Sequence, residues 1–166
     1  MPRDLWDFAC HLYRRDGVEQ ACLQLQDNAG VDVSALLLCC WLAQTYGEHA
    51  ERHLDTLLAD VATWSRQLVA PLRRARYWYR NQPDSARDAA LYRQLKGVEL
   101  MAEKALLQQL DSRARQLLGN PQQTATARGA AALRFIDRYL KSTAIVLDGG
   151  TQQQLTLILA ALDDDS

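Results

Sequence analysis

The residues best suited to chemistry are arginines that recur along one short segment of the chain. Arg73, Arg76 and Arg80 are spaced by three and four residues, so on a helix they share one face, and Tyr77 lies among them. A guanidinium group binds a phosphate or a carboxylate through two hydrogen bonds, and a tyrosine ring can stack on a base. Together with Arg66, these residues form the candidate partner- or anion-binding surface.

The distribution of charge leaves several partners open for this surface. Residues 1–60 carry a net charge of −6, whereas residues 61–96 carry seven arginines and one lysine against two aspartates, and the whole chain has a net charge of −1. The arginines can pair with the acidic amino-terminal half, within one molecule or across a homodimer. They can also bind an acidic protein partner or RNA, for example on the ribosome. We favour a non-catalytic, protein-binding or regulatory accessory protein.

Other chemistry finds less support in the sequence. His49 and His53 are four residues apart, as two metal ligands on one helix face would be, but the sequence offers no clear third ligand. A nucleophile elbow and a glycine-rich phosphate loop are both missing. We therefore expect no metal ion and no cofactor, and a metal-dependent or small-molecule enzyme is the third alternative.

The surface must be held by helices, because apolar residues recur with a period of 3.6 almost throughout. The sequence predicts an all-α fold, a compact orthogonal or bundle-like array of about seven helices around an apolar central helix at Val33–Tyr46. Asp4 and Asp32 are expected N-caps, and Gly30 an expected C-cap. Capping boxes are expected at Ser85–Asp88 and Thr151–Gln154, and a kink or break is expected at Pro71.

The chain is expected to form a single domain over residues 1–166, with a loop at 122–126 and a frayed acidic tail at 163–166. The amino terminus does not resemble a secretory signal, and the longest apolar run is too short to span a membrane. The four cysteines form no CxxC pair and lie in apolar segments. These features predict a cytoplasmic protein without a membrane partner.

Two blocks of sequence resemble a known family. The first half contains Leu5-Trp6-Asp7-Phe8, Gly17-Val18, Ala21-Cys22-Leu23, Leu25-Gln26-Asp27, Gly30, Asp32-Val33, Leu36-Leu37 and Trp41-Leu42, followed later by Trp64, Val69-Ala70-Pro71-Leu72-Arg73 and Arg76. This pattern resembles an uncharacterised proteobacterial family of unknown function. The resemblance implies a bacterial, cytoplasmic, helical protein, and it transfers no catalytic or binding residue.

Overall fold

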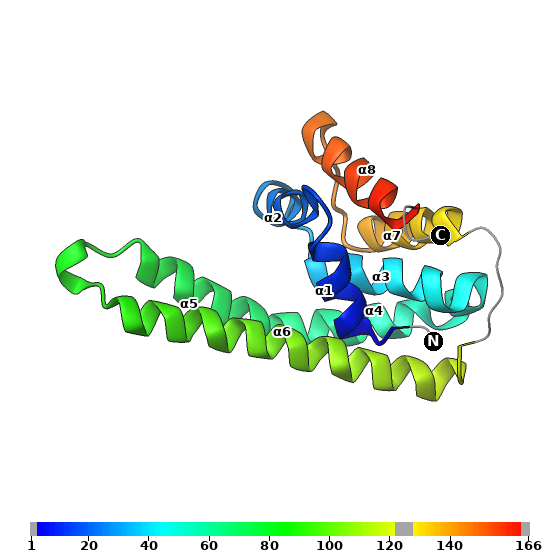
Figure 1. Cartoon of the computed structure of the whole chain (residues 1–166), viewed down its shortest axis with the longest axis horizontal. Coiled ribbons are helices and arrows are strands. Elements are labelled where there is room, and N and C mark those ends of the chain that lie inside the picture. Colours follow the sequence, from blue (N-terminus) through cyan, green and yellow to red (C-terminus); the bar gives the residue numbers. More distant parts are fainter. Residues whose placement is uncertain (1–2, 122–127, 164–166) are drawn as a thin grey trace.

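The computed structural model describes residues 3–121 and 128–163, and within these ranges the chain contains helices and no strand (Figure 1). The predicted all-α fold is therefore confirmed. The loop predicted at 122–126 and the tail beyond residue 163 lie outside the described residues. The α-helices are α1 (Leu5–Tyr13), α2 (Val18–Ala29), α3 (Val33–Tyr46), α4 (Leu54–Trp64), α5 (Ala70–Arg80), α6 (Ala89–Leu118), α7 (Arg128–Ser142) and α8 (Gly149–Asp163).

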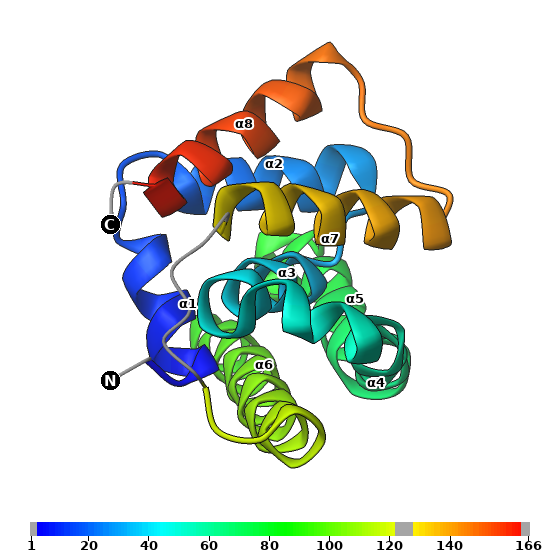
Figure 2. The ribbon, with the colours of Figure 1, turned by 90° about the vertical axis from the view of Figure 1, so that its right-hand side faces the viewer.

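Helix α3 forms the centre of the core, as its apolar sequence predicts. All of its residues except Val33 and Gln44 are buried, and Figure 2 shows α3 enclosed by α1, α2, α4, α6 and α7. The helix begins where the Asp32 carboxylate accepts a hydrogen bond from the Ser34 N–H at 2.9 Å, which confirms the predicted N-cap. The Asp32 N–H itself donates to the Tyr139 hydroxyl at 2.8 Å, and this bond joins the start of α3 to α7.

Polar contacts also fix the shorter helices around α3. The Asp4 carboxylate caps α1, as predicted, and the buried Asp111 of α6 accepts a hydrogen bond from the Leu5 N–H at 2.8 Å. Helix α2 ends at Gly30, whose φ of +70° is the left-handed conformation predicted for a C-cap. Helix α2 then packs against α8. None of the described helices combines the length and the apolar character that crossing a membrane demands.

Helices α4 and α5 are joined without a break, although Pro71 predicted a kink or an end. A π-helical turn at Ser65–Val69 connects them, and in it the Ala70 N–H donates to the Ser65 carbonyl five residues back. Because a π-helical turn is wider than an α-helical one, it leaves room for a proline ring in the first turn of α5. The Ser65 hydroxyl donates to the Asp32 carboxylate, so the turn is tied to the start of α3.

Helix α5 and the first part of α6 project from the rest of the molecule as a long helical hairpin (Figure 1). We call residues 70–98 the arm, because none of them is buried, whereas Val69 and Glu99 at its two ends are. The prediction of a compact array did not include this projection. A short turn links the two helices at the tip, where the Tyr79 hydroxyl accepts a hydrogen bond from the Asp88 N–H at 2.5 Å.

Two of the predicted capping boxes are wrong in their first residue. Asp88, rather than Ser85, is the N-cap of α6, since its carboxylate accepts from the Ala90 N–H at 2.7 Å. Helix α8 begins at Gly149, and the Asp148 carboxylate accepts from the Thr151 N–H at 2.8 Å. In both cases an aspartate one turn from the expected cap takes the position, because a carboxylate is a strong acceptor there.

Candidate functional site

The root of the arm holds two of the predicted arginines in a cluster of ion pairs with α6. The Arg73 Nε lies 2.8 Å from Glu99 Oε1, and the Arg73 Nη2 lies 2.6 Å from Glu103 Oε1. The Arg76 Nε contacts the other oxygen of Glu99. Glu99 is only 5% exposed, so its carboxylate bridges the two guanidinium groups inside the protein. This root cluster of four residues fastens α5 to α6.

The two carboxylates of the root cluster differ in their electrostatics. Burial raises the pKa of Glu99, but the hydrogen bonds and the positive charges of Arg76 and Arg73 together lower it more, and the net pKa lies below its ordinary value. Burial also raises the pKa of Glu103, and there the single arginine does not compensate, so its net pKa is raised. The charge of the cluster is therefore held most firmly at Glu99.

The structure divides the predicted site residues into two groups. Arg73 and Arg76 are paired internally, and their partners lie on α6 rather than in the acidic amino-terminal half that the sequence suggested. Arg66 is exposed on the π-helical turn. Arg80 is exposed near the tip, with its guanidinium carbon 4.9 Å from the centre of the Tyr77 ring. Two of the predicted arginines are therefore engaged at the root of the arm, and the other two are exposed.

One contact does reach from the arm to the amino-terminal half. The Tyr77 hydroxyl donates a hydrogen bond to an Asp27 carboxylate oxygen at 3.2 Å, and Arg76 lies 4.6 Å from the centre of the same ring. Asp27 belongs to the last turns of α2. At this contact α2 approaches α5. Nearer to the root of the arm, an open hollow lies between the two helices.

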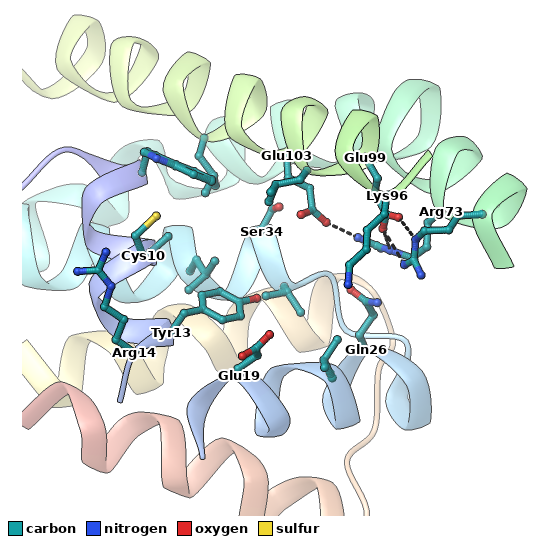
Figure 3. A pocket seen from close by; sticks show the side chains of 18 residues that line it. Cys10, Tyr13, Arg14, Glu19, Gln26, Ser34, Arg73, Lys96, Glu99 and Glu103 are labelled. Carbon is teal, nitrogen blue, oxygen red and sulfur yellow. Dashed lines mark hydrogen bonds and ion pairs between the residues drawn. The ribbon is translucent and has the colours of Figure 1, made fainter. Parts of the chain in front are cut away.

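This hollow is a groove of about 490 Å³ with α3 at its floor, α1 and α2 along one side and α5 and α6 along the other (Figure 3). The root cluster forms part of its wall. Its apolar lining comes from all of these helices except α5, and its polar lining includes cations, carboxylates and a thiol. The apolar lining residues are Trp6, Ala9, Leu23, Val33, Leu37, Leu100 and Leu107, and the others are Cys10, Tyr13, Arg14, Glu19, Gln26, Ser34, Arg73, Arg76, Lys96, Glu99 and Glu103.

Burial holds the Tyr13 phenol, which lines the groove, and the neighbouring Cys22 thiol in their neutral forms. Burial, followed by the neighbouring Cys22, raises the pKa of Tyr13 far above its ordinary value. Burial likewise raises the pKa of Cys22 to about 11. Cys10 also lines the groove, but it is only half-buried, whereas the other three cysteines are buried. Tyr13 is consequently a hydrogen-bonding group at neutral pH, and Cys10 is the thiol that solvent reaches.

The predicted histidine pair does not share a helix face. His49 and His53 lie in a 3₁₀-helix, Gly47–His53, in which residues four apart point in different directions. The Arg52 guanidinium lies 2.6 Å from His49 Nδ1. Within residues 3–121 and 128–163, no group of three or more potential metal-binding side chains is found.

Sequence reasoning missed the residues that determine how the arginines are used. Glu99 and Glu103 lie 23–30 residues beyond their arginine partners. Their spacing of four on a long helix was a usable signal, because it places both carboxylates on the side that faces an antiparallel α5. Lys96 was also missed, since it belongs to no motif. Trp78, which the sequence offered beside Tyr77 as a ring that could stack on a base, is highly exposed.

Comparison with known proteins places the chain in a family. Residues 4–110 match the family described as protein of unknown function (DUF2390), so the chain belongs to this family. The match begins at the N-cap of α1 and ends within α6. It includes the arm and every residue that lines the groove, whereas α7 and α8 lie outside it. No curated protein and no solved structure matches the chain.

Proposed function

We propose that this member of the family is a non-catalytic accessory protein that binds another protein through its arm. The observation that carries the proposal is the exposure of Trp78, which is 67% accessible on a hairpin without a buried residue. A tryptophan in water loses the free energy that burial of its ring would provide. Tryptophan and arginine also dominate the energetic centres of protein interfaces.

The exposed apolar surface extends from Trp78 along the arm and just past its end at residue 98. Leu91, Val98 and Met101 are all exposed, and their spacing of seven and three places them on one side of α6. This side is turned away from Lys96 and Leu100, which line the groove. The arm therefore offers an apolar surface that is separate from the groove.

The charges of the arm favour an acidic partner. Arg73, Arg76 and Arg87 have carboxylate partners on α6 or in the tip turn. In the described parts of the chain, no ion pair involves Arg74 or Arg93. Arg74 also lies four residues before Trp78, so the two residues share one side of α5. Cationic groups beside an exposed ring suit a protein surface that carries carboxylates.

RNA binding through the same cations is the competing function. Nucleic-acid binding relies on phosphate contacts and falls steeply as the salt concentration rises. The exposed Leu91, Val98 and Met101 would contribute little to phosphate contacts, and they favour a protein partner. We also propose a cytoplasmic location, which is supported by four free cysteines that suit a reducing compartment.

The test compares Trp78→Ala with Leu133→Ala, a matched control that removes an exposed apolar side chain from α7, outside the arm. Tagged wild-type and variant proteins are expressed in the native host, cross-linked, purified and quantified by mass spectrometry. We expect one stoichiometric protein partner with the wild type and with Leu133→Ala, and its loss with Trp78→Ala. Retention of that partner by Trp78→Ala would refute the proposal.

Two other outcomes identify a different function or partner. Nuclease-sensitive ultraviolet absorbance that disappears at high salt, and with Arg74→Glu, would establish RNA binding instead. A doubled mass of the purified wild type, lost with Trp78→Ala, would make a second copy of this chain the partner.

A further inference from the structure

We propose that the groove at the root of the arm binds a small amphiphilic anion, a molecule with an apolar chain and one anionic head group. This site is independent of the partner surface on the arm. The groove has a volume of about 490 Å³, which lies within the usual range for small-molecule sites. It is open to solvent, because Leu100 is exposed although it lines the groove, so a ligand can enter without unfolding the helices.

The apolar part of the groove would bind the hydrocarbon chain of the ligand. Leu37 on the floor and Leu107 on the α6 side are buried, and Trp6 packs against the core beside them. Leu100 is 54% exposed although it lines the same groove. An apolar chain that covers Leu100 would remove this surface from water, which is the main driving force for binding in such a site.

The charged end of the groove would bind the anionic head group. Lys96 extends from α6 towards Gln26 of α2, beside Arg73 (Figure 3). The two arginines and two glutamates of the root cluster neutralise one another through their ion pairs. Among the residues that the structure describes, no ion pair involves Lys96, so one positive charge is left over at this end.

A cationic ligand fits the groove less well. The carboxylates of Glu99 and Glu103 already accept hydrogen bonds from the arginines, so a ligand ammonium would have to compete with them. Arg14 lies at the other end of the groove, beside Cys10 (Figure 3), and it adds a second positive charge there. Glu19 is a third carboxylate in the lining, but four cations stand against the three carboxylates, so the lining keeps a net charge of +1. An anion meets a cation at each end, together with the amide of Gln26 as a hydrogen-bond donor.

The experiment measures binding of octanoate, octyl phosphate and octanol to the full chain by isothermal titration calorimetry. The three probes have the same chain length and differ in the head group. We expect both anions to bind saturably with one site, and octanol to bind at least about tenfold more weakly, as the loss of a charge-assisted contact implies. The stronger of the two anions then identifies the head group as carboxylate or phosphate.

A matched pair of charge reversals locates the site. Lys96→Glu changes the groove, whereas Arg93→Glu makes the same change on the exposed surface of the same helix, outside the groove. We expect Lys96→Glu to weaken binding of the anions by at least about tenfold and Arg93→Glu to change it less than about twofold. Equal effects of the two reversals would mean that the anion is held by the general charge of the arm.

Protection of Cys10 from alkylation gives an independent readout within the groove. Bound octanoate or octyl phosphate should slow the reaction of Cys10 with iodoacetamide in the wild type and in Arg93→Glu, but not in Lys96→Glu. Equal affinity for octanol and the anions, no saturable binding of any probe, or binding without protection of Cys10 would each overturn the proposal.

Discussion

Replacing Glu99 by glutamine tests the physical account of how the arm is held. Glutamine has nearly the same shape, and it keeps one acceptor oxygen but removes the charge. In the wild type, Glu99 accepts hydrogen bonds from both Arg73 and Arg76, and it is buried at the root of the arm. The variant would leave two guanidinium groups sharing one neutral acceptor.

The expected cost follows from the burial of the three side chains. Breaking a buried ion pair by removing one partner costs about 3–5 kcal/mol. The side chains of Arg73 and Arg76 are 20% and 12% exposed, and Glu103 still binds Arg73, so water and a second carboxylate compensate for part of the loss. We expect Glu99→Gln to lower the free energy of unfolding by about 2–3 kcal/mol, and the melting temperature by roughly 5–10 °C.

Urea unfolding of the wild type, Glu99→Gln and Glu103→Gln provides the assay. Glu103 is the matched control, because its side chain is 30% exposed, it pairs with one arginine and its pKa is raised by burial. Its replacement should cost less than about 1 kcal/mol. Equal losses of unfolding free energy in the two variants, or a loss below about 0.5 kcal/mol for Glu99→Gln, would refute the assignment of the buried charge to Glu99.

The dependence of stability on pH provides a second test of the same prediction. The pKa of Glu99 in the folded protein is lowered, because the hydrogen bonds and charges of the two arginines together outweigh the effect of burial. Its stabilisation is therefore fully present above the ordinary glutamate pKa of about 4.3, and it is lost as the pH falls through the lower folded-state value. The difference in stability between wild type and Glu99→Gln should be constant near neutral pH and should shrink below about pH 4.

Three further predictions concern the core and the groove. Iodoacetamide should label Cys10 alone in the native protein at neutral pH, because the other thiols are buried and burial raises the pKa of Cys22 to about 11. Detection of a second labelled cysteine by mass spectrometry would contradict this prediction. Tyr139→Phe removes the acceptor of the Asp32 N–H and should cost about 1–2 kcal/mol in urea unfolding. Gly17→Ala forces a side chain into a φ of +78° and should cost about 1–2 kcal/mol, and an unchanged unfolding midpoint would exclude that strain.

The parts of the fold that could be predicted from the sequence are those determined by neighbouring residues. Asp4, Asp32 and Gly30 end or begin helices through contacts within one turn, so their types and positions were enough. The central place of α3 also followed, because a helix that is apolar on all sides has to be enclosed. The caps at Asp88 and Asp148 were harder to place, since several capping residues compete within one turn there.

The arm could not be predicted from the periodicity of α5 and α6. Their apolar residues recur as those of a core helix would, but Leu91 and Val98 remain exposed, because no helix among the described residues covers that side of α6. A helical period indicates that two residues share a side, and it does not indicate whether another helix covers that side. The projection of the hairpin depends on the unbroken passage from α4 to α5 through the π-helical turn.

The candidate site was predicted in part. The helical spacing predicted that Arg73 and Arg76 lie on one face, and both of them line the groove. Their carboxylate partners depend on the register of α5 against α6, which is set by the length of the tip turn. The other walls of the groove come from α1, α2 and α3, and no local pattern indicates that these helices meet the root of the arm.

The ionic character of the arm's root is better explained by the groove than by stability. Buried ion pairs can often be replaced by apolar residues of similar volume without loss of stability, so leucines and methionines at these positions would hold α5 against α6 as well. An apolar root would, however, extend the apolar lining of the groove to its end. The paired Arg73, Arg76, Glu99 and Glu103 instead provide a polar, nearly neutral wall beside Lys96. Such a wall solvates an anionic head group and leaves the lysine charge available to bind it.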